Sequence, residues 1–166
     1  LKTVLQKKPR GTADAVKIAI KSKSIKNNNK ILILCGDVPF ISSKSLKAII
    51  KKTNDNDICL GTTLLENPSG YGRIVRQNNN IIKIVEEKDA NNKIKKINEV
   101  NTGILCIKEG VLRKYIQKIK NNNNQKEYYL TDVIELINEN GIVKTKKIDN
   151  PKEIMGINTI KQLESF

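Results

Sequence analysis

The sequence contains few aromatic residues, few cysteines and no long apolar run. Only 4% of its 166 residues are aromatic, and no RNA- or DNA-binding fingerprint is present, so we do not expect nucleic-acid binding. The three cysteines, Cys35, Cys59 and Cys106, lie far apart inside apolar runs and lack a Cys-x-x-Cys spacing. That pattern supports neither a disulfide framework nor a zinc site, and we expect buried structural thiols.

No apolar run approaches the roughly 18 residues that a membrane span requires, so no membrane contact is expected. Residues 1 to 20 scatter Lys and Arg among apolar positions, unlike a signal peptide, which makes the cytoplasm the expected location. The length suits one domain, residues 1–166, with a single hydrophobic core. The first residue is Leu1 rather than Met, and we expect that an N-terminal portion is missing.

The formal net charge is +14, from 31 basic and 17 acidic residues. Such a charge attracts nucleic acid, acidic lipid or phosphorylated small molecules. The lysines are scattered among Asn and Ile and form no single stripe, which favours a general compositional bias over a dedicated binding surface.

Hydrophobic periodicity predicts alternating helices and strands along the whole chain. We expect helices over 12–25, 43–52 and 109–119, one starting near 131 and one after 158, and strands over 31–35, 58–65, 97–107 and 142–148. The segments 73–76 and 81–86 flank an Asn-rich turn and predict an inserted β-hairpin. The β-α-β order of 31–65 predicts a parallel pair with a right-handed crossover, and hence a mixed, mainly parallel α/β sheet flanked by helices.

Polar, glycine-bearing segments follow or interrupt the apolar strands. Gly36-Asp37-Val38-Pro39 ends the strand at 31–35, the usual place of a ligand or metal carboxylate in an α/β protein. Asp37 alternatively serves as a turn or helix-cap residue. Two further segments of this kind are Asn67–Arg73 and Glu99–Gly103.

These segments carry a resemblance to a known family over nearly the whole chain. The sequence resembles the uridylyltransferase domain of bacterial N-acetylglucosamine-1-phosphate uridylyltransferases, whose fold is Rossmann-like and GT-A-like. Seven matching stretches occur in the same order: Gln6-x4-Gly11-Thr12, Gly36–Pro39, Asn67–Arg76, Ile84–Ala90, Glu99–Gly103, Glu127–Asp132 and Gly156–Asn158.

The resemblance implies transfer of uridylyl from UTP to N-acetylglucosamine 1-phosphate, giving UDP-N-acetylglucosamine and pyrophosphate for cell-wall and lipopolysaccharide precursors. Such chemistry needs no protein nucleophile, because the sugar phosphate attacks the α-phosphorus directly when it is positioned in line and its charge is screened. Mg²⁺ is the hard, oxygen-seeking ion expected there. In the family pattern, Asp37 and Asn158 bind the metal, and Asp37 is thereby catalytic. Asn158 alternatively caps the last helix.

The resemblance also assigns the two substrates to separate groups of residues. Gln6, Gly11, Thr12 and Gly36 match nucleotide-binding positions, and Gly72, Glu86, Asn101 and Thr131 match positions that hold the amino sugar and its phosphate. Alternatives remain for several residues: Thr12 as a helix cap, Glu86 as a solvated charge, Tyr71 and Tyr129 as packing, and Arg73, Arg76 and Lys88 as basic surface rather than phosphate contacts.

The sequence also departs from the family pattern. Ala13-Asp14 stands where Gly-His is frequent, and Cys35 replaces a frequent Tyr. The Gly-rich, triphosphate-binding loop lies upstream of every matching residue, and the C-terminal β-helix acetyltransferase is not represented. We therefore expect an incomplete domain that is inactive by itself, with an exposed sheet edge, and leave oligomerisation to the full-length protein.

Two other functions remain open from the sequence. One is a different sugar-1-phosphate nucleotidyltransferase on the same fold, which base and sugar preference would distinguish. The other is a noncatalytic module that binds nucleotide sugars or anionic partners, which salt-sensitive binding to nucleic acid would favour.

Overall fold

A computed structural model describes residues 3–21, 29–54, 56–157, 159–160 and 164. Its α-helices are α1 (Thr12–Lys21), α2 (Ser43–Lys52), α3 (Asn92–Lys95), α4 (Glu109–Ile116) and α5 (Val133–Asn138). Its strands are β1 (Lys30–Ile33), β2 (Ile58–Leu64), β3 (Arg73–Gln77), β4 (Asn80–Val85), β5 (Glu99–Lys108) and β6 (Val143–Lys147), and 3-10 turns are η1 (Glu87–Asp89), η2 (Leu130–Asp132) and η3 (Pro151–Ile154).

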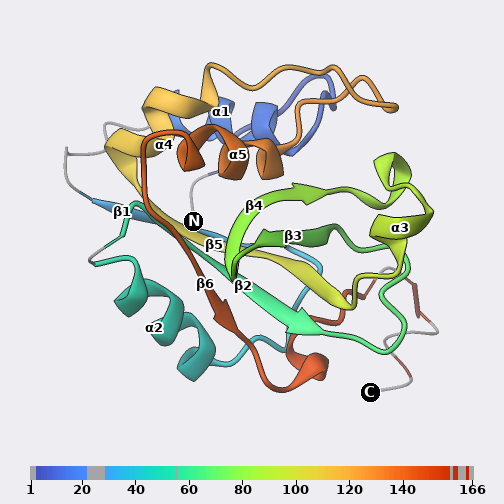
Figure 1. Cartoon of the computed structure of the whole chain (residues 1–166). Helices are drawn as coiled ribbons and strands as arrows, with labels where there is room; N and C mark the ends of the chain where they lie inside the picture. Colours follow the sequence, from blue (N-terminus) through green and yellow to red (C-terminus); the bar gives the residue numbers. More distant parts are fainter. Residues whose placement is uncertain (1–2, 22–28, 55, 158, 161–163, 165–166) are drawn as a thin grey trace.

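The strands form one mixed sheet with helices on both faces (Figure 1). The strand order is β4-β3-β5-β2-β6, and β1 pairs with β5 beside this path. Helices α1, α4 and α5 cover one face, while α2 covers the other. The predicted α/β class, the flanking helices and the inserted hairpin are therefore confirmed.

The strand pairing differs from the predicted parallel pair of β1 and β2. Strand β5 lies between them, and its residue Ile107 stands opposite Ile31 on one side and Ile58 on the other. Both pairings are antiparallel, and among the described strands only β2 and β6 pair in parallel. A mainly parallel pairing is therefore wrong, although β1 and β2 do run in the same direction. Sequence order cannot reveal that a later apolar strand is inserted between two earlier ones.

Local sequence accounts for the elements that frame the site. Helix α2 begins where the Ser42 hydroxyl accepts the Ser45 N–H at 3.1 Å, and its apolar stripe buries Ile49 completely. The β3–β4 hairpin turns through Asn78 and Asn79, whose φ values of 49° and 65° fit a two-residue turn with positive φ at both positions.

Two apolar clusters hold the layers together. The larger lies beneath α1, α4 and α5 and includes Leu60, Leu112 and Ile134, while the smaller lies beneath α2 and includes Ile49 and Cys106. Cys59 is buried as well, but Cys35 is exposed, so burial of all three cysteines was wrong. Strand β1 ends at Ile33, and Cys35 already belongs to the loop beyond it.

Helix ends and termini also differ in detail. Helix α4 ends at Ile116 rather than 119, and the helix expected near 131 opens with the 3-10 turn η2. The helix expected after 158 lies largely outside the described residues. Within the described chain, no helix has the length and apolar character needed to cross a membrane.

Candidate functional site

A cavity of about 400 Å³ opens at the end of β1, and we call it the Asp37 pocket. Four of the predicted site residues contribute to it from separate segments: Asp37 after β1, Gly72 before β3, Glu86 after β4 and Asn101 within β5. The full lining is Cys35, Asp37, Val38, Gly70, Tyr71, Gly72, Glu86, Asn101, Thr102, Gly103, Ile154 and Gly156. The fold thus gathers residues that are remote in sequence.

Asp37 is exposed at the rim of this pocket. Its carboxylate has no hydrogen-bond or ion-pair partner among the described residues, while its carbonyl accepts the Ile157 N–H at 2.8 Å. That bond holds the chain up to residue 157 beside Asp37. The other predicted metal ligand, Asn158, lies outside the described residues.

A metal ion at Asp37 would rest on few protein ligands. The described residues contain no group of three or more His, Cys, Asp or Glu side chains that would hold a metal. Mg²⁺ commonly keeps several waters and takes one or two carboxylates together with substrate phosphates. A single accessible, unpaired carboxylate fits that mode of binding, and does not fit a site enclosed by protein alone.

Glu86 forms the inner wall of the pocket against Gly72. Its Oε1 accepts the Thr131 hydroxyl at 2.8 Å. A Cβ on Gly72 would lie only 3.1 Å from Glu86 Oε2, so glycine permits the carboxylate to approach the backbone closely. Burial raises the pKa of Glu86, the Thr131 hydrogen bond opposes that shift, and the charge of Asp89 adds to it. Thr131 does not line the pocket; it orients Glu86.

Asn101 also lines the pocket and binds the Gly72 backbone. Its backbone N–H donates to the Gly72 carbonyl at 2.8 Å, and its Oδ1 accepts the Gly103 N–H at 3.1 Å. No hydrogen bond of its Nδ2 occurs among the described residues, so an amide donor stays available in the pocket. Such a donor suits an acetamido or hydroxyl acceptor.

Cys35 lines the pocket and was not predicted to do so. Its Sγ lies 3.7 Å from the Gly103 carbonyl. Although the residue is exposed, partial desolvation raises the pKa of its thiol, and the charges of Asp37 and Glu86 raise it further. A raised pKa disfavours the thiolate, which is the form of cysteine that acts as a nucleophile.

Tyr71 lines the pocket and is half-buried, whereas Tyr129 is buried and donates its hydroxyl to Gln125 Oε1 at 3.0 Å. Burial and the charge of Asp37 raise the pKa of the Tyr71 hydroxyl. Of the two alternatives considered for these residues, Tyr71 lines the pocket and Tyr129 packs in the interior. The sequence signal for Tyr71 was its position between two glycines.

None of the predicted nucleotide-binding residues is among the lining of the Asp37 pocket, although Gly36 stands between Cys35 and Asp37, which line it. Gln6 Nε2 donates to Asp14 Oδ2 at 2.9 Å, and this bond is the main cause that lowers the pKa of Asp14. The Thr12 hydroxyl accepts the Leu130 N–H at 3.0 Å, and Thr12 is the first residue of α1 rather than the residue before it. Gly36 is exposed, and a Cβ there would meet nothing within 4 Å.

Two of the basic residues considered for phosphate screening are engaged in ion pairs. Arg73 is 1% exposed and its Nη2 lies 2.7 Å from Glu87 Oε2. Arg76 donates to both carboxylate oxygens of Glu99 at 2.7 Å. Neither guanidinium lines the Asp37 pocket, so neither contacts a phosphate there. The sequence alone predicted no role for Glu87, the partner of Arg73.

Comparisons with known proteins show the family and the fold of the chain. A model of the nucleotidyl transferase family matches residues 1–152. The protein named Bifunctional protein GlmU of Thermosipho melanesiensis is 47% identical over 164 residues, covering 98% of this chain and 35% of that protein. The protein of the same name from Buchnera aphidicola subsp. Acyrthosiphon pisum is 42% identical over 164 residues, with the same two coverages.

The chain therefore spans about a third of the length of these curated relatives. Among solved structures, a nucleoside-diphosphate-sugar pyrophosphorylase from Vibrio cholerae matches with a TM-score of 0.61 at 15% identity, covering 89% of this chain and 61% of that one. At that identity the likeness concerns the fold alone. Together with the match over residues 1–152, these findings show that the chain belongs to the nucleotidyl transferase family.

Proposed function

We propose that this chain carries the metal-binding and sugar-phosphate-binding part of a sugar-1-phosphate uridylyltransferase. The observation that supports it most is the Asp37 pocket, where Asp37, Glu86 and Asn101 meet around Gly72. Its substrates would be UTP and N-acetylglucosamine 1-phosphate, and its ion Mg²⁺. We also propose that residues 1–166 belong to one domain, and that this stretch is inactive by itself.

The reaction would proceed by direct displacement. An oxygen of the sugar phosphate forms a bond to the α-phosphorus of UTP, the bond from that phosphorus to the bridging β-oxygen breaks, and pyrophosphate leaves. Mg²⁺ held by Asp37 and Asn158 would supply the positive charge that screens the two anions. No protein nucleophile is needed for this displacement.

The chain's own groups would bind and orient the acceptor sugar. The Asn101 amide nitrogen would donate to the acetamido carbonyl, and Glu86, which accepts the Thr131 hydroxyl, would accept a hydrogen bond from a sugar hydroxyl. Gln6, Gly11, Thr12 and Gly36 remain the predicted nucleotide side. Their present contacts include Asp14 and the segment around Tyr128, which would shape rather than contact the base.

The test is pyrophosphate release from UTP and N-acetylglucosamine 1-phosphate with Mg²⁺. We would compare this chain with a version extended upstream by the corresponding segment of the Thermosipho melanesiensis relative. Activity in the extended protein alone is the expected result. Folded but inactive proteins in both cases would contradict the proposal, and a preference for another nucleotide or sugar would redirect it within the family.

A substitution at Asp37 tests the metal site within the active version. Asp37→Asn should reduce turnover more than about 100-fold, because even groups that only support a metal ligand are worth about 10 to 100-fold. Asp149→Asn is the matched control, since Asp149 is exposed and its side chain has no hydrogen bond or ion pair among the described residues. Equal, Mg²⁺-dependent turnover in both variants would remove Asp37 from the metal site.

A further inference from the structure

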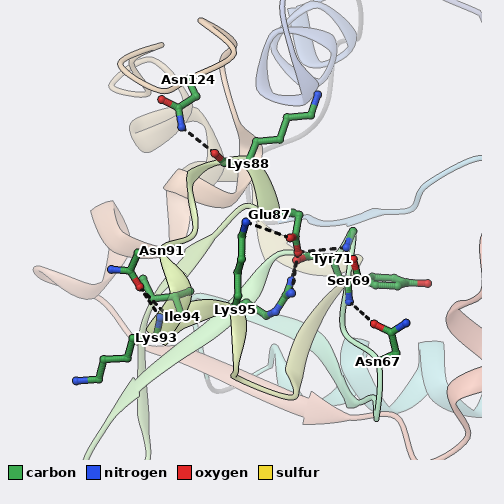
Figure 2. A network of polar contacts seen from close by, with 12 residues as sticks. Asn67, Ser69, Tyr71, Glu87, Lys88, Asn91, Lys93, Ile94, Lys95 and Asn124 are labelled. Carbon is green, nitrogen blue, oxygen red and sulfur yellow. Dashed lines mark hydrogen bonds and ion pairs between the residues drawn. The ribbon is translucent and has the colours of Figure 1, made fainter.

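One wall of the Asp37 pocket is a loop held by an ion pair between a buried arginine and a partly exposed glutamate. Gly70, Tyr71 and Gly72 form this wall just before β3. Arg73 follows them, is 1% exposed, and donates through Nη1 to the Tyr71 carbonyl and through Nη2 to Glu87 Oε2 at 2.7 Å. Figure 2 shows the Glu87 carboxylate facing this loop.

Glu87 receives contacts from both sides. The same Oε2 that pairs with Arg73 accepts the Gly70 N–H at 3.2 Å, and Oε1 lies 3.8 Å from Lys95 Nζ on α3 (Figure 2). The loop is thus fixed at Gly70 and Tyr71 by one carboxylate and one guanidinium. Glu87 is also the residue directly after Glu86, the wall of the pocket.

The turn η1 that carries Glu87 holds a second segment as well. The Lys88 carbonyl accepts from Asn124 Nδ2 at 2.7 Å (Figure 2), and Asp89 Oδ1 accepts the Asn124 N–H at 2.9 Å. The chain after Asn124 leads to Thr131, which orients Glu86. The turn η1 therefore contacts two segments beside Glu86. It holds the Gly70–Gly72 loop through Glu87, and the chain at Asn124 through Lys88 and Asp89.

Stability alone does not account for this ion pair. Arg73 Nε is buried and has no hydrogen-bond partner among the described residues, which is unfavourable for a guanidinium. An ion pair with one buried and one partly exposed member gains little net stability, because burial costs desolvation and exposure weakens the attraction. What two charge-assisted hydrogen bonds do provide is a fixed geometry for the groups that they join.

We propose that Arg73 and Glu87 are positioning residues, which set the Gly70–Gly72 wall at the distance from Glu86 and Asn101 that the acceptor sugar phosphate requires. This inference rests on the proposed function for the identity of the ligand. The geometric part, that Glu87 fixes the wall, is independent of the ligand and has its own readout.

The experiment measures the affinity of the extended, folded protein for two probes, N-acetylglucosamine 1-phosphate and UTP. Glu87→Gln should weaken binding of the sugar phosphate about five- to tenfold, because the Gly70 N–H loses its charged acceptor and Arg73 loses its counter-charge. Binding of UTP should stay within about twofold. Glu66→Gln is the matched control, since Glu66 is exposed beside the same loop and has no partner among the described residues. Equal losses for both probes would indicate general destabilisation and overturn the proposal.

A double variant separates positioning from stability. Arg73→Met with Glu87→Gln leaves no unpaired buried charge, so unfolding should stay near that of the parent protein. The weakened sugar-phosphate binding should persist, because the wall is no longer held. Recovery of both stability and affinity would overturn the proposal.

Amide NMR spectra distinguish failure of this inference from failure of the proposed function. Glu87→Gln should shift the Gly70 and Gly72 amide resonances and speed hydrogen exchange at Gly70, whether or not a ligand binds. If the parent protein binds neither probe but these amides respond, the proposed function fails and the positioning by Glu87 stands. Unchanged Gly70 and Gly72 amides would refute the positioning even in a protein that binds both probes.

Discussion

Replacing Gly11 by alanine tests whether this glycine is required by packing. Gly11 has a φ of +108°, a conformation that side chains with a Cβ rarely adopt. A Cβ at this position would lie 2.5 Å from the Tyr128 carbonyl oxygen and 2.7 Å from the Tyr128 nitrogen. Both are backbone atoms, so no side-chain rotation relieves the collision, and one of the two segments must move.

The loss of stability follows from the hydrogen bonds that this movement breaks. The Ala13 N–H donates to the Tyr128 carbonyl at 2.9 Å, and the Tyr128 N–H donates to the Arg10 carbonyl at 2.8 Å. Each bond contributes about 0.5–1.5 kcal/mol, and a residue forced into a sparsely populated φ costs about 1–3 kcal/mol. We expect Gly11→Ala to lower the free energy of unfolding by about 2–6 kcal/mol, a large part of the stability of a typical domain.

Urea unfolding followed by circular dichroism measures this loss, and Gly110→Ala is the control. Gly110 lies in α4, is exposed, and a Cβ there would meet nothing within 4 Å. Alanine at that helical position should raise stability by up to about 1 kcal/mol. A Gly11→Ala protein within about 0.5 kcal/mol of the parent would refute the packing argument and leave ligand contact as the reason for glycine.

Three other predictions follow from local geometry and charge. Lys126 has a φ of 58°, so Lys126→Gly should raise the free energy of unfolding by about 0.5–1 kcal/mol, and an unchanged urea midpoint would count against it. Burial raises the pKa of Asp132 to about 6, with the charge of Glu135 contributing. The native state therefore binds this proton more tightly than the unfolded state, and stability falls as pH rises from about 4 to about 6. Asp132→Asn should thus stabilise the protein at pH 7, by about 1 kcal/mol after allowance for solvent screening, and not below pH 4; equal gains in thermal unfolding at both pH values would contradict this. A Cβ on Gly103 would lie 2.6 Å from Cys35 Sγ at a φ of 74°, so Gly103→Ala should cost about 1–3 kcal/mol and added Cys35→Ala should recover only part of it, whereas complete recovery would show that φ carries no cost.

The sequence predicted the elements of the fold better than their pairing. Helix α2 was placed over the residues that it occupies, because a serine cap and an apolar stripe are both local signals. The position of β5 between β1 and β2 depends on which apolar edges meet in space. An apolar run such as Ile104–Ile107 can pair with any of several other strands, so no local pattern specified its neighbours.

The candidate site divides in the same way. The position of Asp37 after an apolar strand was itself a local signal for a ligand or metal carboxylate, whereas Glu86 was assigned only through the family resemblance. The close approach of Tyr128 to Gly11 joins segments far apart in the chain, and no spacing in the sequence predicts this contact. Burial of Arg73 was equally hidden, because its partner Glu87 lies in a segment where charged residues ordinarily face solvent.

Segment 128–131 connects the two groups of predicted site residues. The Leu130 N–H donates to the Thr12 hydroxyl on the predicted nucleotide side, and the next residue, Thr131, donates its hydroxyl to Glu86 in the Asp37 pocket. The backbone of Tyr128 meets the chain at Gly11 through the bonds described above. We therefore expect a displacement of α1 to reach Glu86 through segment 128–131. Substitutions at Thr12 that remove its hydroxyl should disturb both sides of the site.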